Sequence, residues 1–239
     1  MLEAAKEEKA MKIAKVGVFG TGAVGRTVGA KLAELGHSVV IGTRDPAATL
    51  ARTDTDHFGN APFKVWLETQ PKIRLAPFAE AAAQAEVLVN ATVGNGSVPA
   101  FEAAGAANLA GKVLLDISNP LDFSKGFPPF LTVCNTDSLG EQIQRAFPEL
   151  RVVKTLNTVT AAVMVNPKLV AGGDHTIFVS GNDAEAKKTA TAVLQSFGWT
   201  DIVDLGDLTT ARGTEMYLPL WVRLMSATKT PMFSIKLVR

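Results

Sequence analysis

The sequence predicts an α/β protein built on a doubly wound, mostly parallel sheet. Short apolar runs alternate along the chain with runs of helical periodicity, which is the pattern of parallel strands joined by crossover helices. The first such unit also contains Gly20-Thr21-Gly22-Ala23-Val24-Gly25 between its strand and its helix. Because this turn opens the dinucleotide-binding unit of the Rossmann fold, we predict a Rossmann sheet with a smaller C-terminal α/β extension.

The opening unit, residues 15–46, reads as strand, glycine turn, helix and second strand. Apolar residues fill 16–19 and recur after the turn at helical spacing until Gly36 ends the helix. Glycine is expected at 20 for a tight turn, at 22 for close approach of the backbone to a pyrophosphate, and at 25 for close packing of helix on strand. The helix dipole and free N–H groups then attract the phosphates. The cofactor-binding residues predicted here are Gly20, Thr21, Gly22, Ala23, Val24 and Gly25.

The next elements follow from turn residues and periodicity. Asp45 and Pro46 predict an N-cap and the first position of a short helix, and a polar loop covers 52–62. A short helix at 63–68, a third strand at 72–75, an alanine-rich helix at 79–85 and a fourth strand at 86–91 come next. The fourth strand ends in a flexible turn at 92–97.

The second half of the chain continues this alternation. We predict helices at 101–109, 138–147 and 183–197, and strands at 112–117, 152–156, 176–180 and 201–205. Residues 122–130 are rich in proline and glycine and read as a surface loop that could act as a lid. A last helix from Asp207 should kink or restart at Pro219. The predicted domains are an N-terminal extension (1–11), a Rossmann domain that binds the dinucleotide (12–153), and a smaller C-terminal α/β region (154–239) that completes the site of the electron acceptor.

Small or polar residues stand where three predicted strands end. Ala91 and Thr92 follow the fourth strand, Asn119 and Pro120 the fifth, and Asn157 the sixth. In a doubly wound sheet the ligand lies at the carboxyl ends of the strands. We expect the cofactor to contact Ala91, Thr92 and Asn119, and the substrate to contact Pro120 and Asn157. Lys154, within the sixth strand, either packs structurally or faces the ligand.

The end of the second strand indicates which dinucleotide binds. An NAD site usually places a carboxylate there for the ribose 2′-hydroxyl, whereas this chain has Gly42-Thr43-Arg44. A small hydroxyl followed by a guanidinium can hold a 2′-phosphate through charge-assisted hydrogen bonds, so we predict NADP bound by Thr43 and Arg44. The alternative makes Arg44 a solvated surface charge and Asp45 the ribose carboxylate, but Asp45 also has a role as a helix cap.

Composition excludes several function classes. The 239 residues are 47% hydrophobic with a formal net charge of +1, which argues against nucleic acid and for a small-molecule partner. No run of about 18 apolar residues is long enough for a membrane span, and the first residues lack the apolar segment of a signal peptide. Cys134 is the single cysteine, so no disulfide can form within the chain and a reducing cytoplasm is the expected location. Cys134 itself is expected to be a buried, inert residue rather than a nucleophile, because no histidine lies near it in the sequence. Cysteine and histidine do not cluster in the sequence, so no metal site is predicted.

These motifs resemble the family of NADP oxidoreductases dependent on coenzyme F-420, a deazaflavin, whose Rossmann module also occurs in the cytosolic part of the STEAP metalloreductases. The matching segments are GTGAVG at 20–25, GTR at 42–44, SNP at 118–120, VVKTLNT at 152–158, GDLTTAR at 206–212, the helix with LPLW at 218–221, and the closing FSIKLVR. The resemblance implies NADP as cofactor and coenzyme F-420 as co-substrate. The turn at 90–96 departs from the family's apolar residue and Pro-Trp-like pair beside the expected nicotinamide pocket.

Three functions are compatible with these residues. Hydride transfer from nicotinamide to a flavin-like ring needs two stacked rings in a dry pocket more than it needs an acid. An imine or 2-hydroxyacid-type reductase would need a proton donor, and His37, His57 and His175 lie away from the strand ends while Tyr217 lacks a lysine four residues on. The third is a protein that senses NADP and regulates a partner without turnover. We expect the first, assign no side chain a catalytic role, and expect a homodimer formed through the apolar C-terminal helix and tail.

Overall fold

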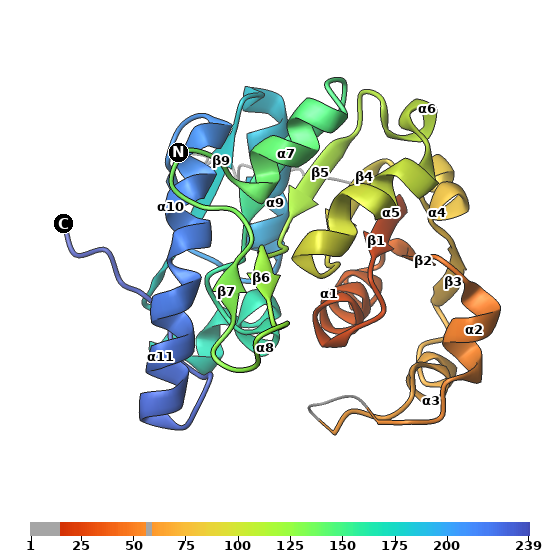
Figure 1. The fold of residues 1–239 in the computed structure, drawn as a ribbon, viewed down its shortest axis with the longest axis horizontal. Helices are drawn as coiled ribbons and strands as arrows, with labels where there is room; N and C mark the ends of the chain where they lie inside the picture. The colour runs from red at the N-terminus through yellow and green to blue at the C-terminus, as the bar shows by residue number, and fades with distance from the viewer. Residues whose placement is uncertain (1–14, 56–58) are drawn as a thin grey trace, which may run out of the picture.

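The computed structural model describes residues 15–55 and 59–239. The predicted extension at 1–11 and His57 lie outside the described residues. An eight-stranded sheet runs through the described chain in the order β3-β2-β1-β4-β5-β8-β9-β10 (Figure 1). Its strands are β1 (Lys15–Phe19), β2 (Ser38–Thr43), β3 (Ile73–Pro77), β4 (Val87–Asn90), β5 (Val113–Asp116), β8 (Arg151–Thr155), β9 (Thr176–Gly181) and β10 (Asp201–Asp204).

The direction of the strands confirms the doubly wound, mostly parallel fold. From β3 through β8 every neighbouring pair is parallel. β9 is antiparallel to β8, and β10 is parallel to β9. The strand order reverses between β1 and β4, so this is the point where a doubly wound sheet binds its ligand.

Helices cover both faces of the sheet. One face packs against α1 (Ala23–Glu34), α8 (Ala161–Val165) and α9 (Ala184–Ser196). The other packs against α4 (Phe78–Gln84), α5 (Ser97–Ala104), α6 (Ala106–Leu109) and α7 (Leu139–Ala146). The remaining helices are α2 (Pro46–Ala51) and α3 (Phe63–Glu68) beside β3, and α10 (Ala211–Met216) and α11 (Leu218–Thr228) at the opposite end of the molecule (Figure 1).

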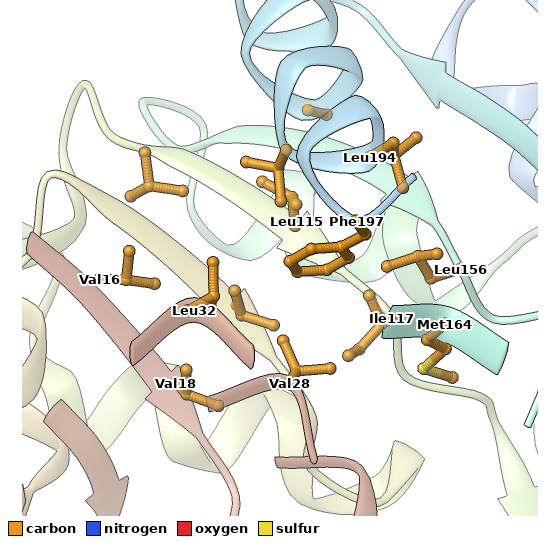
Figure 2. Packing of buried hydrophobic residues seen from close by; sticks show 14 of the residues in the cluster. Val16, Val18, Val28, Leu32, Leu115, Ile117, Leu156, Met164, Leu194 and Phe197 are labelled. Atoms are coloured by element: carbon orange, nitrogen blue, oxygen red, sulfur yellow. The ribbon is translucent and has the colours of Figure 1, made fainter. Parts of the chain in front are cut away.

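The strands are buried on both faces because alternate side chains point to opposite sides. Val16 and Val18 of β1 belong to the core under α1 and α9, whereas Phe19 belongs to the core under α4 and α5. In Figure 2 the ring of Phe197, at the end of α9, lies among aliphatic side chains of the core under α1 and α9. This double burial explains why the strands read as near-continuous apolar runs rather than as alternating ones.

Two predicted elements differ from the structure. The helix predicted at 101–109 is two helices, α5 and α6, which meet at Gly105 with a φ of +83°; a residue in this left-handed region ends a helix. The helix also begins earlier, since α5 starts at Ser97, directly after the 3₁₀ turn η1 (Gly94–Gly96). The predicted surface loop is bounded by an antiparallel hairpin, β6 (Leu121–Asp122) with β7 (Phe130–Leu131).

The C-terminal part largely follows the prediction. Asp207 begins the 3₁₀ turn η4 (Leu208–Thr210), α10 follows, and the chain restarts as α11 with Pro219 in its first turn. The remaining short helices are η2 (Pro167–Leu169) and η3 (Ala171–Gly173). The predicted domain boundary at residue 153 falls inside β8, so the sheet itself does not divide at that position.

Candidate functional site

The glycine turn places its three glycines in different surroundings. A Cβ atom on Gly20, whose φ is +120°, would lie 2.4 Å from the carbonyl oxygen of Ala91, and one on Gly25 would lie 2.1 Å from the carbonyl oxygen of Gly20. A Cβ on Gly22 would meet no atom within 4 Å. The turn is therefore packed at its first and third glycines and open at the second, which suits a pyrophosphate approaching the backbone there.

The helix after this turn is ready to receive anionic groups. Gly22 is the N-cap of α1. Within the described residues, no side chain accepts a capping hydrogen bond at this end of the helix. The N–H groups of the first turn have no partner within a helix, and the positive end of the helix dipole lies with them. Predicted residues Thr21, Ala23 and Val24 lie in this turn, and Ala91 packs against it through its contact with Gly20. The structure thus brings the end of β4 to the glycine turn.

The end of β2 presents a guanidinium to solvent. Arg44 is exposed and, within the described chain, has no hydrogen-bond or ion-pair partner. Thr43 is buried, with its hydroxyl 3.0 Å from that of Thr49. The carboxylate of Asp45 accepts a hydrogen bond of 2.9 Å from the N–H of Ala48 and caps α2, as predicted. Asp45 is thereby engaged with its own helix, while Arg44 is available to a ligand.

The predicted residues at the ends of β5 and β8 lie together. The Asn119 amide donates to the carbonyl of Asn157, and the Asn157 amide donates to the side-chain oxygen of Asn119, both at 3.0 Å. Asn157 also donates to the carbonyl of Thr214 in α10. A Cβ on Gly94 would lie 2.7 Å from the Cα of Pro120, so the turn after β4 packs directly on this loop. The predicted cofactor and substrate residues therefore share one edge of the sheet.

Thr92 is held at this edge by buried side chains. Its hydroxyl donates to the side-chain oxygen of Asn90 at 2.7 Å and lies 2.8 Å from the hydroxyl of Ser97. The amide nitrogen of Asn90 donates to Asp116 at 2.9 Å. The hydrogen bonds of Thr92 join the first residue of the predicted turn to the end of β4 and to Ser97 at the start of α5.

Beneath the edge lies a buried charged cluster that combines Asp116, Lys154 and Glu215. The ammonium of Lys154 is 2.9 Å from a carboxylate oxygen of Asp116 and 2.7 Å from one of Glu215, and all three side chains are buried. Burial alone would lower the pKa of Lys154, but the two carboxylates outweigh it and raise the pKa above its usual value. The lysine is therefore a charged, structurally paired residue rather than one that faces an open site.

Sequence reasoning missed Asp116 and Glu215 and left Lys154 open. The signal for the first two was a charge next to an apolar strand or helix face: Asp116 ends VLLD, and Glu215 lies among the buried residues of α10. A charged residue in such a place is almost always paired. The pairing itself depends on three elements that are far apart in the sequence.

Other predicted residues have structural roles or different surroundings. His175 is buried, packs edge-on against Trp199 and has Nε2 2.8 Å from the carbonyl oxygen of Pro167. The expectation that Cys134 is buried is wrong, because it lies exposed in the loop before α7. In the described residues, no group of three or more potential ligands could hold a metal ion. Across residues 15–55 and 59–239, no helix has the length and apolar character of a membrane span.

The fold and this site define a dinucleotide-binding protein of the Rossmann class. Comparison with known proteins is more specific, since residues 15–120 match the family model described as NADP oxidoreductase, coenzyme F420-dependent. A crystal structure of a protein from Arthrobacter sp. FB24, whose name proposes an F420-dependent NADP reductase, has a TM-score of 0.91 and 59% identity, covering 94% of this chain and 99% of that one.

Two curated relatives are similar to this chain over most of its length. The F420-dependent NADP reductase of Methanothermobacter marburgensis is 25% identical over 90% of this chain and 92% of its own length. Metalloreductase STEAP3 of Rattus norvegicus is 28% identical over 91% of this chain, and the chain spans 38% of its length. The chain belongs to the coenzyme F420-dependent NADP oxidoreductase family, which places it among the NADP-dependent oxidoreductases.

Proposed function

We propose that this protein transfers a hydride between the nicotinamide of NADP(H) and the deazaflavin coenzyme F-420. The observation that carries the proposal is the presence, in a chain of this family, of an open glycine turn together with an Arg44 at the end of β2 that is exposed and has no partner among residues 15–55 and 59–239. The names of the Arthrobacter and Methanothermobacter relatives point to the same acceptor.

The predicted site residues would bind different parts of the cofactor and the acceptor. The glycine turn and the first turn of α1 would hold the pyrophosphate, and Thr43 and Arg44 the 2′-phosphate. Ala91, Thr92 and Asn119 would contact the nicotinamide half, and Pro120 and Asn157 the acceptor. NADP supplies the hydride chemistry when bound, so the chain's task is to orient two rings and exclude water between them.

The polar side chains at the ligand edge support a reaction without an acid. Thr92, Asn119 and Asn157 carry hydroxyl or amide groups, and each is engaged in hydrogen bonds with its neighbours. Such groups orient a ligand but do not exchange a proton near neutral pH. Hydride transfer between two rings is the reaction that requires least beyond this.

An NADPH oxidation assay against coenzyme F-420, flavins, ferric chelates, 2-ketoacids and cyclic imines tests the proposal. Turnover with the deazaflavin alone is the expected result. Turnover with imines or ketoacids would identify the alternative reductase, and tight NADPH binding without turnover would identify a sensor. The cytoplasmic location and the homodimer stay predictions.

The choice of dinucleotide is tested by Arg44→Ala. Loss of a charge-assisted pair with the 2′-phosphate should weaken NADPH binding about 10- to 100-fold and leave NADH binding nearly unchanged. Isothermal titration calorimetry measures both dissociation constants. Arg223→Ala, which removes an exposed arginine of α11, is the matched control. Unchanged NADPH affinity in Arg44→Ala would show that this residue does not read the 2′-phosphate.

A further inference from the structure

A row of polar side chains crosses the middle of the sheet. Asn90 of β4 is paired in register with Asp116 of β5, and Asp116 with Lys154 of β8. Each of these three residues is at most 1% exposed. On the same face the flanking strand residues Leu88, Leu114 and Val152 belong to an apolar core. An ionic row in this position therefore needs a reason beyond core packing.

Lys154 uses all three of its ammonium protons. Besides Asp116 and Glu215, its Nζ donates to the carbonyl oxygen of Ser118 at 2.7 Å. The other carboxylate oxygen of Asp116 accepts from the hydroxyl of Ser118 at 2.6 Å and from the amide of Asn90. One lysine and its partner thereby fix the backbone and the side chain of the residue that precedes Asn119.

The same cluster reaches α7 and α10. Glu215, in α10, accepts hydrogen bonds from the N–H groups of Leu139 and Gly140 at 2.8 and 3.2 Å. These are the first N–H groups of α7, whose helix dipole also favours a negative charge there. The second carboxylate is thus compensated by a helix end, and Lys154 links that helix end to the ligand edge.

The two halves of the expected cofactor site differ in their connection to this cluster. On the side of β4, β5 and β8, Thr92 is tied to the cluster through Asn90, and Asn119 through Ser118. On the side of β2, the hydroxyl of Thr43 pairs with Thr49, and Arg44 has no partner in the described chain. The cluster therefore holds the ends of β4, β5 and β8 in place, whereas the end of β2, on the adenosine side of the switch point, is not connected to it.

We propose that Lys154 is a positioning residue for the nicotinamide half of NADP(H): through Ser118 and Asp116 it sets the strand ends that orient the ring, and it leaves the adenosine half untouched. The inference rests on the proposed function for the identity of the cofactor. Stability alone is a weak reason for the cluster, because buried ion pairs are often no more stabilising than apolar residues of similar size.

Two ligands separate positioning from simple destabilisation. NADPH contains both halves, whereas adenosine 2′,5′-bisphosphate carries the adenosine and its 2′-phosphate without nicotinamide. In Lys154→Met we expect the dissociation constant of NADPH to rise about tenfold or more, the effect of losing one or two oriented hydrogen bonds. The dissociation constant of the bisphosphate should stay within about twofold of wild type, since no hydrogen bond to it is altered.

The controls address folding. Leu114→Ala opens the same core next to Asp116 without touching the charges, so it should leave the ratio of the two dissociation constants as in wild type. If Lys154→Met does not fold, Asp116→Asn/Lys154→Met keeps the net charge of the cluster, one carboxylate being left on Glu215 at the end of α7. The same split between the two ligands is expected in this double variant.

The outcomes are distinct. Equal weakening of both ligands, or no weakening of NADPH, in a folded variant would overturn the positioning role while the proposed function stands. Failure of wild type to bind either ligand would overturn the proposed function, and the inference with it.

Discussion

At the scale of single residues, Gly22 and Gly25 belong to one motif but have opposite surroundings. Gly22→Ala should fold normally, because its φ of −75° suits alanine and a Cβ there meets nothing within 4 Å; the free energy of unfolding should change by no more than about 1 kcal/mol. NADPH binding should be lost, since the new methyl group occupies the space of the pyrophosphate.

Gly25→Ala is the matched comparison. Its Cβ would lie 2.1 Å from the carbonyl oxygen of Gly20, so the turn must shift, and we expect a loss of about 1–3 kcal/mol in stability as well as loss of binding. Chemical denaturation and calorimetry measure the two effects separately. If the Gly22→Ala protein binds NADPH as tightly as wild type does, the pyrophosphate does not bind at this turn.

Tyr217 distinguishes the two enzyme reactions. Its hydroxyl is buried without a hydrogen-bond partner in the described chain, three residues after Thr214, which accepts from Asn157. Burial raises the pKa of Tyr217, so the hydroxyl stays protonated. With hydride transfer between rings, Tyr217→Phe should keep kcat within about twofold, whereas a role as proton donor would cost about 100- to 10,000-fold. Steady-state kinetics with the preferred acceptor decides.

Residues whose roles depend on local geometry could be predicted from the sequence. The cap of α2 by Asp45 was predictable because the carboxylate, the proline that follows it and the N–H that it accepts from all lie within four residues of one another. The roles of Asp116 and Glu215 could not be predicted, since their partner Lys154 is 38 residues from one and lies on a different element from both. Cys134 was mispredicted because a general preference of cysteine for burial does not account for its place in an irregular loop.

At the scale of elements, α7 has a pH-dependent anchor. Arg145 in its last turn holds both carboxylate oxygens of Asp137 at 2.8 and 2.7 Å. The pKa of Asp137 is lowered from 3.8 to about 2, mainly by the hydrogen bonds from Arg145 and to a smaller extent by those from Gln142 and the N–H of Ser138. A carboxyl group whose pKa is lower in the folded than in the unfolded chain stabilises the fold at pH values above its unfolded pKa. That stabilisation is lost as the pH falls from about 4 to about 2.

The difference in unfolding free energy between wild type and Arg145→Gln should therefore be largest above pH 4 and shrink towards pH 2. Urea denaturation at each pH measures it. Arg223 of α11 is exposed, and Arg223→Gln serves as the control. Its difference in unfolding free energy from wild type should not shrink between pH 4 and pH 2. A constant difference for Arg145→Gln would mean that the pair does not stabilise the fold.

Elements with strong periodicity or clear caps were predictable, and those set by a glycine or by long-range pairing were not. The periodicity of 183–197 gave α9 nearly to the residue, since its first and last turns are capped locally. Gly105 divided a predicted helix because only the backbone angle, not the residue type, distinguishes a tolerated glycine from a helix end. The hairpin of β6 and β7 is two residues long on each side and has too little sequence to show alternation.

At the scale of the molecule, exposed apolar side chains on α11 and the C-terminal tail favour association of two copies. Leu220, Leu224, Leu237 and Val238 are 56%, 36%, 42% and 86% exposed. The tail itself is held beside the start of β9, where the N–H of Thr176 donates to the carbonyl oxygen of Ile235 and the N–H of Leu237 donates to the hydroxyl of Thr176. Leu220 and Leu224 lie one helical turn apart on one face of α11. We expect a dimer in solution and expect Leu220→Asp/Leu224→Asp to be a monomer.

Size-exclusion chromatography with light scattering measures the mass of each protein. Leu169→Asp places a single aspartate on a 52% exposed leucine of η2, outside α11, and should leave the dimer intact. A wild-type mass equal to one chain would show that the apolar face is not a dimer interface.

The reversal of the last two strands has a consequence for how such a protein diversifies. Since β9 and β10 run against the other strands, the chain after β8 returns to the ligand edge through α10, which meets Asn157 there, and not through another strand end. A helix lying on a sheet can be exchanged or displaced without breaking a ladder of backbone hydrogen bonds. Under the proposed function, substitutions in α10 that keep the contacts of Glu215 with Lys154 and α7 would alter the acceptor side of the site and leave the strands that bind the nucleotide in place.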